Sequence, residues 1–260
     1  MSAPTPVTEA DIQPLRRLNV VAGLLHAASL AAVLVLANGF SLPVTSTYEI
    51  GGPGNGFSAP ALLFNIRVAY AIAAFLGLSA LFHFIVASPQ GFKRYAASLM
   101  QGRNIFRWVE YSLSSSIMII VIAQLNGISE IAALVAIFGV NVSMILFGWL
   151  QEKFTTPGEG EWLPFIFGCV AGAVPWLIFA VKLAAPNGPP GNETPGFVYG
   201  IVLSLFVLFN CFALVQWKQY RAKGKWANYL RGERTYIVLS FITKSLLAWQ
   251  IFGSTLATKG

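Results

Sequence analysis

One lysine, Lys244, lies inside the last apolar stretch of this sequence, where a charged side chain is costly. An amine held in a dry site can act as a nucleophile toward carbonyl carbons. The position therefore favours a Schiff base between Lys244 and an aldehyde. Once protonated, such an imine is a buried cation and requires a buried anion nearby.

Glu110 is the carboxylate that the sequence places well inside an apolar stretch, and we expect it to be the counterion. Arg107 stands three residues earlier on the same helix, so it is expected to share the charge of Glu110. At ~1.5 Å of rise per residue, Lys244, Glu110, His26 and His83 fall in one layer, roughly 8–13 Å below the same membrane surface. The plainer alternative is that each is a satisfied polar residue of the core, which four groups at one depth disfavour.

An aldehyde with a long apolar tail would also need an aromatic slot. Trp108, Trp176, Phe209 and Trp249 lie inside four different apolar stretches, and small residues near them would leave space for a polyene. Aromatic side chains fill the core of any membrane protein, so this pattern alone does not establish a ligand.

The amino-acid composition indicates that these apolar stretches lie in a lipid bilayer. The chain is 56% hydrophobic and 10% charged, with a mean hydropathy of +0.66, whereas a soluble domain carries about 25% charged residues. A helix that spans a membrane needs roughly 20 apolar residues. The predicted spans are Leu18–Phe40, Ala61–Ser88, Asn104–Leu125, Ile128–Leu150, Trp162–Ala184, Gly196–Tyr220 and Thr235–Ala257. We therefore expect an all-α bundle of seven transmembrane helices in the cell membrane, a multi-pass protein in a lipid bilayer.

The predicted organisation is a single domain over residues 1–260, with a polar N-terminal segment at 1–17 and an extramembrane loop at 41–60. The net charge of +7 is attributed to loops rather than to a nucleic-acid site. Arginines and lysines gather at the N-terminus and in the loops that follow the second, fourth and sixth spans. They are Arg16, Arg17, Lys93, Arg94, Arg103, Lys153, Lys218, Arg221, Lys223, Lys225, Arg231 and Arg234. The other side has only Lys182 and Lys259, so the N-terminus is predicted to be cytoplasmic and the C-terminus extracellular.

The sequence resembles the heliorhodopsins, retinal proteins with inverted membrane topology. The resemblance covers essentially every span. It is carried by FLGLSALFHFIV (75–86), NIFRWVEYSLSSS (104–116), IFGVNVSMILFGWLQEK (137–153), PGFVYG (195–200), KGKWANYLRGER (223–234) and YIVLSFITKSLLAWQIF (236–252). The third and seventh spans, which hold Glu110 and Lys244, are the specific ones.

The resemblance implies all-trans-retinal bound covalently to Lys244, with Glu110 as counterion. It implies that a polar cluster accepts the proton of the Schiff base after photoisomerisation, and that the photocycle is slow. The cluster would consist of His26, His83, Ser79, Ser240 and Arg107. The retinal pocket would consist of Trp108, Tyr111, Ser115, Asn141, Ile145, Gly148, Trp176, Phe209 and Trp249. A homodimer and no metal site are also expected.

The sequence favours light sensing without ion pumping. Light-driven proton pumps carry a second carboxylate one turn before the retinal lysine, where this chain has Ser240. Their proton donor, three turns beyond the counterion, corresponds to Val121. A relay across the membrane needs titratable groups or water on both sides of the switch. The leading hypothesis is a photoreceptor that signals to an unknown cytoplasmic partner, and the alternative is a light-driven or light-gated proton or ion transporter. An enzyme is not expected.

Overall fold

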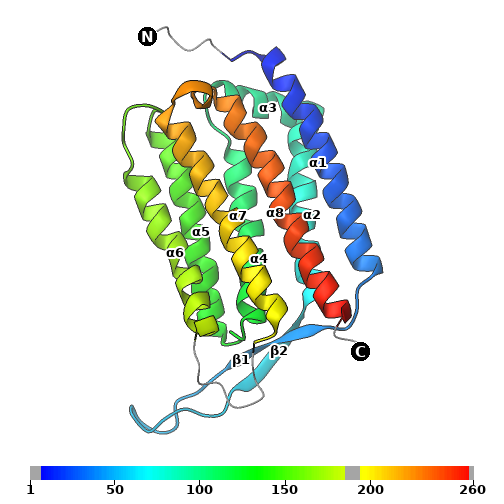
Figure 1. Cartoon of the computed structure of the whole chain (residues 1–260), viewed down its shortest axis with the longest axis vertical. Helices are drawn as coiled ribbons and strands as arrows, with labels where there is room; N and C mark the ends of the chain where they lie inside the picture. The colour runs from blue at the N-terminus through cyan, green and yellow to red at the C-terminus, as the bar shows by residue number, and fades with distance from the viewer. Residues whose placement is uncertain (1–6, 185–193, 258–260) are drawn as a thin grey trace.

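The chain folds as a bundle of long helices that run roughly along one axis (Figure 1). The computed structural model describes residues 7–184 and 194–257. Seven helices in these ranges are long and apolar enough to cross a membrane, which confirms the predicted fold class. They are α1 (Glu9–Val35), α2 (Val68–Ala87), α4 (Ile105–Leu125), α5 (Ile131–Phe154), α6 (Leu163–Ala184), α7 (Gly196–Arg221) and α8 (Tyr229–Ala257).

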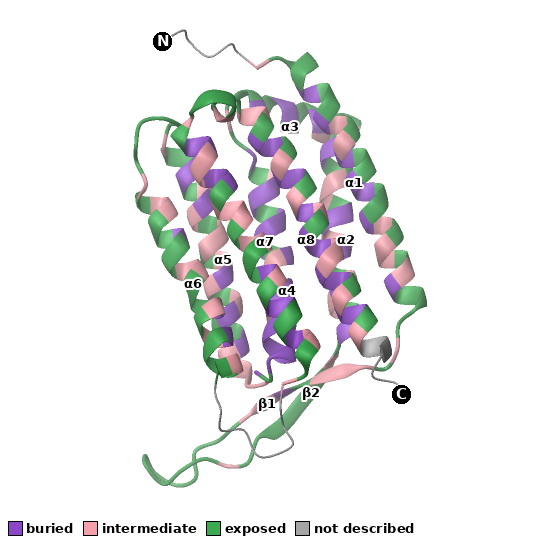
Figure 2. Ribbon diagram, viewed as in Figure 1, coloured by how far each residue is buried: buried purple, intermediate pink, exposed green. Residues whose placement is uncertain are grey.

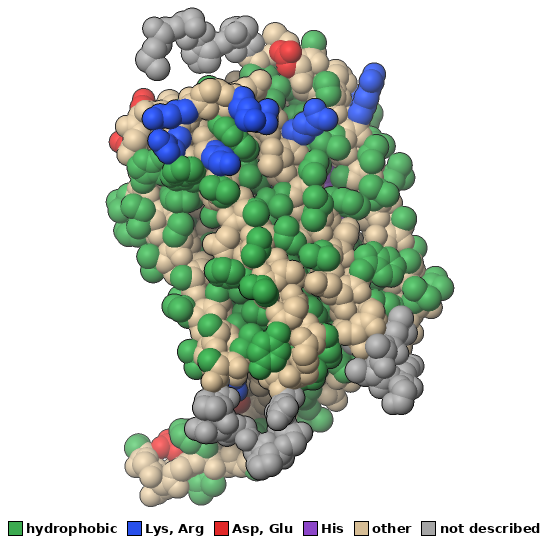
Figure 3. All heavy atoms as spheres, in the orientation of Figure 1, with side chains coloured by type: hydrophobic (Ala, Val, Ile, Leu, Met, Phe, Trp, Pro, Cys, Tyr) green, Lys and Arg blue, Asp and Glu red, His purple; other side chains and the backbone are tan. Residues whose placement is uncertain are grey.

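The two ends of the bundle differ in structure and in charge. The basic end carries the N-terminal segment, the short helix α3 (Pro89–Met100) and the 3₁₀ turn η1 (Gly224–Ala227) (Figure 1). Lysine and arginine side chains gather at this end of the face in Figure 3. The hairpin end carries two antiparallel strands, β1 (Ser41–Ser46) and β2 (Ala61–Arg67). Lys259, which the topology prediction used, lies outside the described residues.

The hairpin takes residues that the sequence analysis assigned to the second span. Residues 61–67 pair with β1, with Ser41 opposite Arg67 and a bulge between Val44 and Thr45. The extramembrane segment therefore continues beyond the predicted loop at 41–60, and the second span begins only at Val68. Val44 is buried, and the Thr45 amide donates to the Ser129 carbonyl at 2.8 Å, so the hairpin is fixed against the turn between α4 and α5.

Helix α1 begins within the predicted polar segment 1–17 and ends before the predicted limit at Phe40. Thr8 and Asp11 form a capping box, in which the Thr8 amide donates to Asp11 Oδ2 at 3.0 Å. Ile12 and Leu15 in the first turns are buried against α3. This apolar pair gives the polar segment a face to bury, so the helix extends beyond the strictly apolar stretch.

Two further differences lie at the basic end. Residues 89–100 were expected to form a loop but form α3, which Ser88 caps by accepting from the Gly91 amide at 3.1 Å. Helix α8 begins at Tyr229 rather than at Thr235, so Glu233 lies on the helix. Both segments are rich in charged or polar residues, and their helices are stabilised by packing rather than by apolar runs.

The buried interior is divided along the bundle axis. Helix α4 has the largest buried share of the seven spans and lies among the others (Figure 2). Toward the hairpin end its buried residues are mostly apolar, such as Met118, Ile119 and Ile122, which pack with Phe75 and Leu247 in one cluster; Gln124 in the last turn is a buried polar exception. Toward the basic end they include Arg107 and Glu110. The fold thus places the chemistry-bearing side chains in one half of the bundle.

Candidate functional site

Lys244 and Glu110 form a buried ion pair between α8 and α4. Lys244 Nζ lies 2.6 Å from Glu110 Oε1, and the two residues are 3% and 5% exposed. Ser79 on α2 donates to the same carboxylate oxygen at 2.7 Å. Lys244 Nζ also lies 5.2 Å from the centre of the Tyr111 ring. The Lys244 ammonium from α8 and the Ser79 hydroxyl from α2 therefore meet at one carboxylate oxygen of Glu110 on α4.

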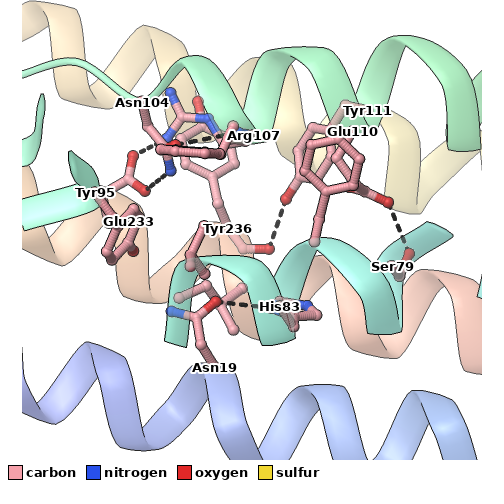
Figure 4. Close-up of a pocket in the computed structure, with 14 residues that line it drawn as sticks. Asn19, Ser79, His83, Tyr95, Asn104, Arg107, Glu110, Tyr111, Glu233 and Tyr236 are labelled. Carbon is pink, nitrogen blue, oxygen red and sulfur yellow. Dashed lines mark hydrogen bonds and ion pairs between the residues drawn. The ribbon is translucent and has the colours of Figure 1, made fainter. Parts of the chain in front are cut away.

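Two cavities meet at this ion pair. The larger has a volume of about 510 Å³, and Lys244 is on its wall. The smaller has a volume of about 40 Å³, and Glu110 and Ser79 are on its wall (Figure 4). Tyr111 and Tyr236 line both. The ion pair therefore connects the large apolar cavity with the small polar one, and Tyr111 and Tyr236 separate the two cavities.

The larger cavity gathers most of the predicted pocket. It is lined by Trp108, Tyr111, Ser115, Ile145, Gly148, Trp176 and Phe209, and Ser240 lines it too. Trp176 packs edge-on against Phe206 and Phe209, with ring centres 5.4 and 5.5 Å away. Phe206, Phe212, Met118 and Met144 also line it and were not predicted. An elongated apolar molecule with an aldehyde at the Lys244 end fits this lining and volume.

Two predicted pocket residues lie elsewhere. Trp249 is 43% exposed, packs against Phe252, and is not among the described residues on the cavity wall. Asn141 is buried behind the wall, where its Nδ2 donates to the hydroxyls of Ser115 and Ser116 at 2.9 Å each. Asn141 can orient Ser115 but does not line the cavity. Neither position is distinguishable from a lining position by sequence spacing alone.

The two histidines are brought together beside the ion pair. Their rings stack at 5.6 Å with an interplanar angle of 12°. His83 Nδ1 lies 2.7 Å from Asn19 Oδ1, and His83 lines the small cavity. His26 is fully buried, and neither of its ring nitrogens has a hydrogen-bond partner among the described residues. The predicted layer of Lys244, Glu110 and the histidines thus exists as one neighbourhood.

Arg107 does not share its charge with Glu110, as the sequence spacing suggested. Its guanidinium pairs with Glu152 at 2.6 Å and with Glu233, and it lies between the rings of Trp108 and Tyr236. Glu110 is therefore not the only carboxylate inside the bundle, because Glu152 and Glu233 are 5% and 1% exposed. Both carboxylates lie outside the predicted spans, because the fourth was expected to end at Leu150 and the last to begin at Thr235.

Comparison with known proteins agrees with this fold. The crystal structure of cyanorhodopsin from the cyanobacterium Tolypothrix sp. NIES-4075 matches with a TM-score of 0.59 at 12% identity, covering 91% of each chain. At that identity the likeness concerns the fold. A comparison with curated proteins found no match. A sequence model of the heliorhodopsin family matches residues 15–256.

The fold is a rhodopsin-like bundle of seven helices, and the protein is an integral membrane protein that crosses the bilayer several times. The chain belongs to the heliorhodopsin family. As a member, it is a retinal photoreceptor in the general sense, and retinal is its chromophore.

Proposed function

We propose that this chain is a light sensor in which all-trans-retinal is bound covalently to Lys244 and Glu110 is the counterion. The observation that carries the proposal is the 2.6 Å contact between Lys244 Nζ and Glu110 Oε1 at the boundary of the large cavity. When bound as a protonated imine, retinal supplies light absorption and a change of shape on isomerisation. The protein residues then determine where the proton on Lys244 Nζ goes.

The groups that could receive that proton lie on one side of the ion pair. Glu110 touches Lys244 directly, and Ser79 steadies the carboxylate. Beyond Glu110 the small cavity leads to His83, which stacks on His26. We therefore assign first acceptance of the proton to this polar cluster, as the family resemblance implied, with Ser240 on the chromophore side. Arg107 is linked to this cluster through the carboxylates it pairs with, Glu152 and Glu233, rather than through Glu110.

The other side of the ion pair supports sensing without net transport. Among the described residues, the buried Asp and Glu side chains are Glu110, Glu152 and Glu233, all in the half toward the basic end. From Met118 to Ile122 the buried face of α4 is apolar. A vectorial relay needs titratable groups or water in both halves. A proton that leaves Lys244 therefore returns by the path it took.

We infer that the basic end faces the cytoplasm, because lysine and arginine accumulate on that side of membrane proteins. The same end offers a surface for a signalling partner around Trp226, which lies between Lys218 and Arg231 at 5.5 and 5.4 Å. A change of charge inside the bundle could bias this surface between two arrangements. The partner, and the homodimer implied by the family, stay predictions.

The test is to add all-trans-retinal to the purified protein and to Lys244→Ala, and to record visible absorption. Wild-type protein is expected to form a coloured pigment and Lys244→Ala to remain colourless. Pigment that survives the Lys244→Ala change would refute the attachment site.

Transport is tested separately, by illuminating the wild-type pigment in liposomes while the external pH is recorded. Sensing predicts no sustained pH change. A sustained pH change that a protonophore abolishes would support the transporter alternative.

A further inference from the structure

The small cavity has a second carboxylate among its lining residues, besides the counterion. Glu110 lines it from α4 and Glu233 lines it from the first turns of α8 (Figure 4). A site needs ~10–15 Å³ to hold one water, so a cavity of about 40 Å³ has room for roughly three. Water in a cavity that both carboxylates line would give a proton a route from one to the other.

Glu233 belongs to a cluster with more acid than base. Arg107 is the one cation in it, and both Glu152 and Glu233 pair with that guanidinium. All three residues are at most 7% exposed. With both carboxylates ionised, the cluster holds one negative charge without a partner, and such a charge is costly inside a protein. One added proton would remove it.

The hydrogen bonds indicate which carboxylate would take that proton. Glu152 accepts from the Arg107 guanidinium, the Tyr229 hydroxyl, the Asn104 amide and the Trp108 indole. Glu233 accepts from Arg107 and from Asn104 Nδ2 within the described residues. A carboxylate with more donors holds its charge better. Glu152 is also not among the residues that line the small cavity, whereas Glu233 is.

The remaining polar groups around this cavity fit the role of an acceptor less well. Burial raises the pKa of Tyr95 to about 12, so this phenol keeps its proton at neutral pH and can relay a proton but not store one. His83 has its Nδ1 engaged by Asn19. Tyr236 and Asn104 carry no charge to neutralise. Glu233 combines access to the cavity with a charge that a proton would balance.

We propose that Glu233 is the residue that stores the proton released from Lys244 in the light. This rests on the proposed light-driven deprotonation of the chromophore. The proton leaves Lys244 Nζ, passes through Glu110 and the small cavity, and converts the Glu233 carboxylate to a carboxylic acid. In the dark it returns by the same groups, so the protein neither gains nor loses a proton.

The experiment is light-minus-dark infrared spectroscopy of the retinal-bound protein, with visible flash spectroscopy of the same samples. Glu233→Gln is compared with Glu152→Gln, because both carboxylates pair with Arg107 and only Glu233 lines the cavity. Wild type and Glu152→Gln are expected to gain a protonated-carboxyl band in the light that shifts in heavy water. Glu233→Gln is expected to lose that band and to accumulate at least about tenfold less of the deprotonated chromophore.

The outcomes separate this proposal from the proposed function. A wild-type chromophore that never deprotonates in light would refute the proton transfer itself. Normal deprotonation with the band intact in Glu233→Gln, or with no such band in wild type, would overturn the role of Glu233 alone. If Glu233→Gln binds no retinal, Glu233→Asp is used. It should move the band rather than abolish it, and an unmoved band would equally overturn the assignment.

Discussion

Glu110 Oε1 accepts from Lys244 Nζ at 2.6 Å and from Ser79 Oγ at 2.7 Å, so one oxygen atom joins α8, α4 and α2. The lysine faces the large apolar cavity and the carboxylate faces the small polar one. The contact between the Lys244 cation and the Glu110 anion therefore lies on the boundary between the two cavities. Changes to either residue should be visible in the colour of the pigment.

Glu110→Gln should move the absorption maximum strongly to the red or deprotonate the imine. The reason is that Glu110 is the anion in contact with Lys244, and removing it leaves a buried cation without a partner. The measurement is the visible spectrum in the dark, with Glu152→Gln as the matched control. A spectrum identical to that of wild type would mean that the counterion is another group.

Gly148→Ala should impair retinal binding. A Cβ at this position would lie 2.6 Å from the Trp108 ring, which lines the large cavity, so the ring would have to move. Gly139 lies on the same helix with nothing within 4 Å of its Cβ position, so Gly139→Ala is the control. We expect a shifted absorption maximum or a severalfold lower pigment yield for Gly148→Ala only. Equal behaviour of the two variants would contradict the close packing at Trp108.

Arg107→Met should be strongly destabilising. It leaves Glu152 and Glu233 buried without their cation, a loss that costs about 3–5 kcal/mol for a broken buried pair. Thermal unfolding of the pigment in detergent would measure it. Adding Glu152→Gln and Glu233→Gln to the same chain should recover part of the lost stability, because no charge is then left alone. A triple variant less stable than Arg107→Met would argue against charge as the cause.

Tyr95 should contribute to loss of stability at alkaline pH. Burial raises the pKa of Tyr95 to about 12, while an unfolded tyrosine titrates near pH ~10. The unfolded chain thus releases its proton first, so the contribution is intact below pH ~10 and falls as the pH rises toward 12. Tyr95→Phe should flatten the fall of the melting temperature across that window. An unchanged slope would show that the other buried tyrosines dominate.

The sequence was a good guide where burial followed from apolar runs. Lys244, Glu110 and the two histidines stand inside such runs, and their depth could be counted along the helices. Arg107, Glu152 and Glu233 were harder, because a helix that continues through charged residues looks like a loop when spans are drawn by hydropathy. Their mutual pairing keeps α4, α5 and α8 helical at the basic end. Helix α3 was missed for the same reason, since its buried residues Phe92, Tyr95 and Leu99 are separated by polar ones.

Tyr111 and Tyr236, which line both cavities, also connect the large cavity to Arg107 by direct contacts. The Tyr111 hydroxyl donates to the Tyr236 carbonyl at 3.0 Å, and the Arg107 guanidinium rests on the Tyr236 ring at 4.2 Å. A displacement that runs from the large cavity toward the small one meets these two rings, because both line both cavities. It would then reach the guanidinium by direct contact, even before any proton has moved. Light could thus act twice on Arg107, Glu152 and Glu233: first by displacing the tyrosine rings against the guanidinium, and later by adding a proton to the cluster.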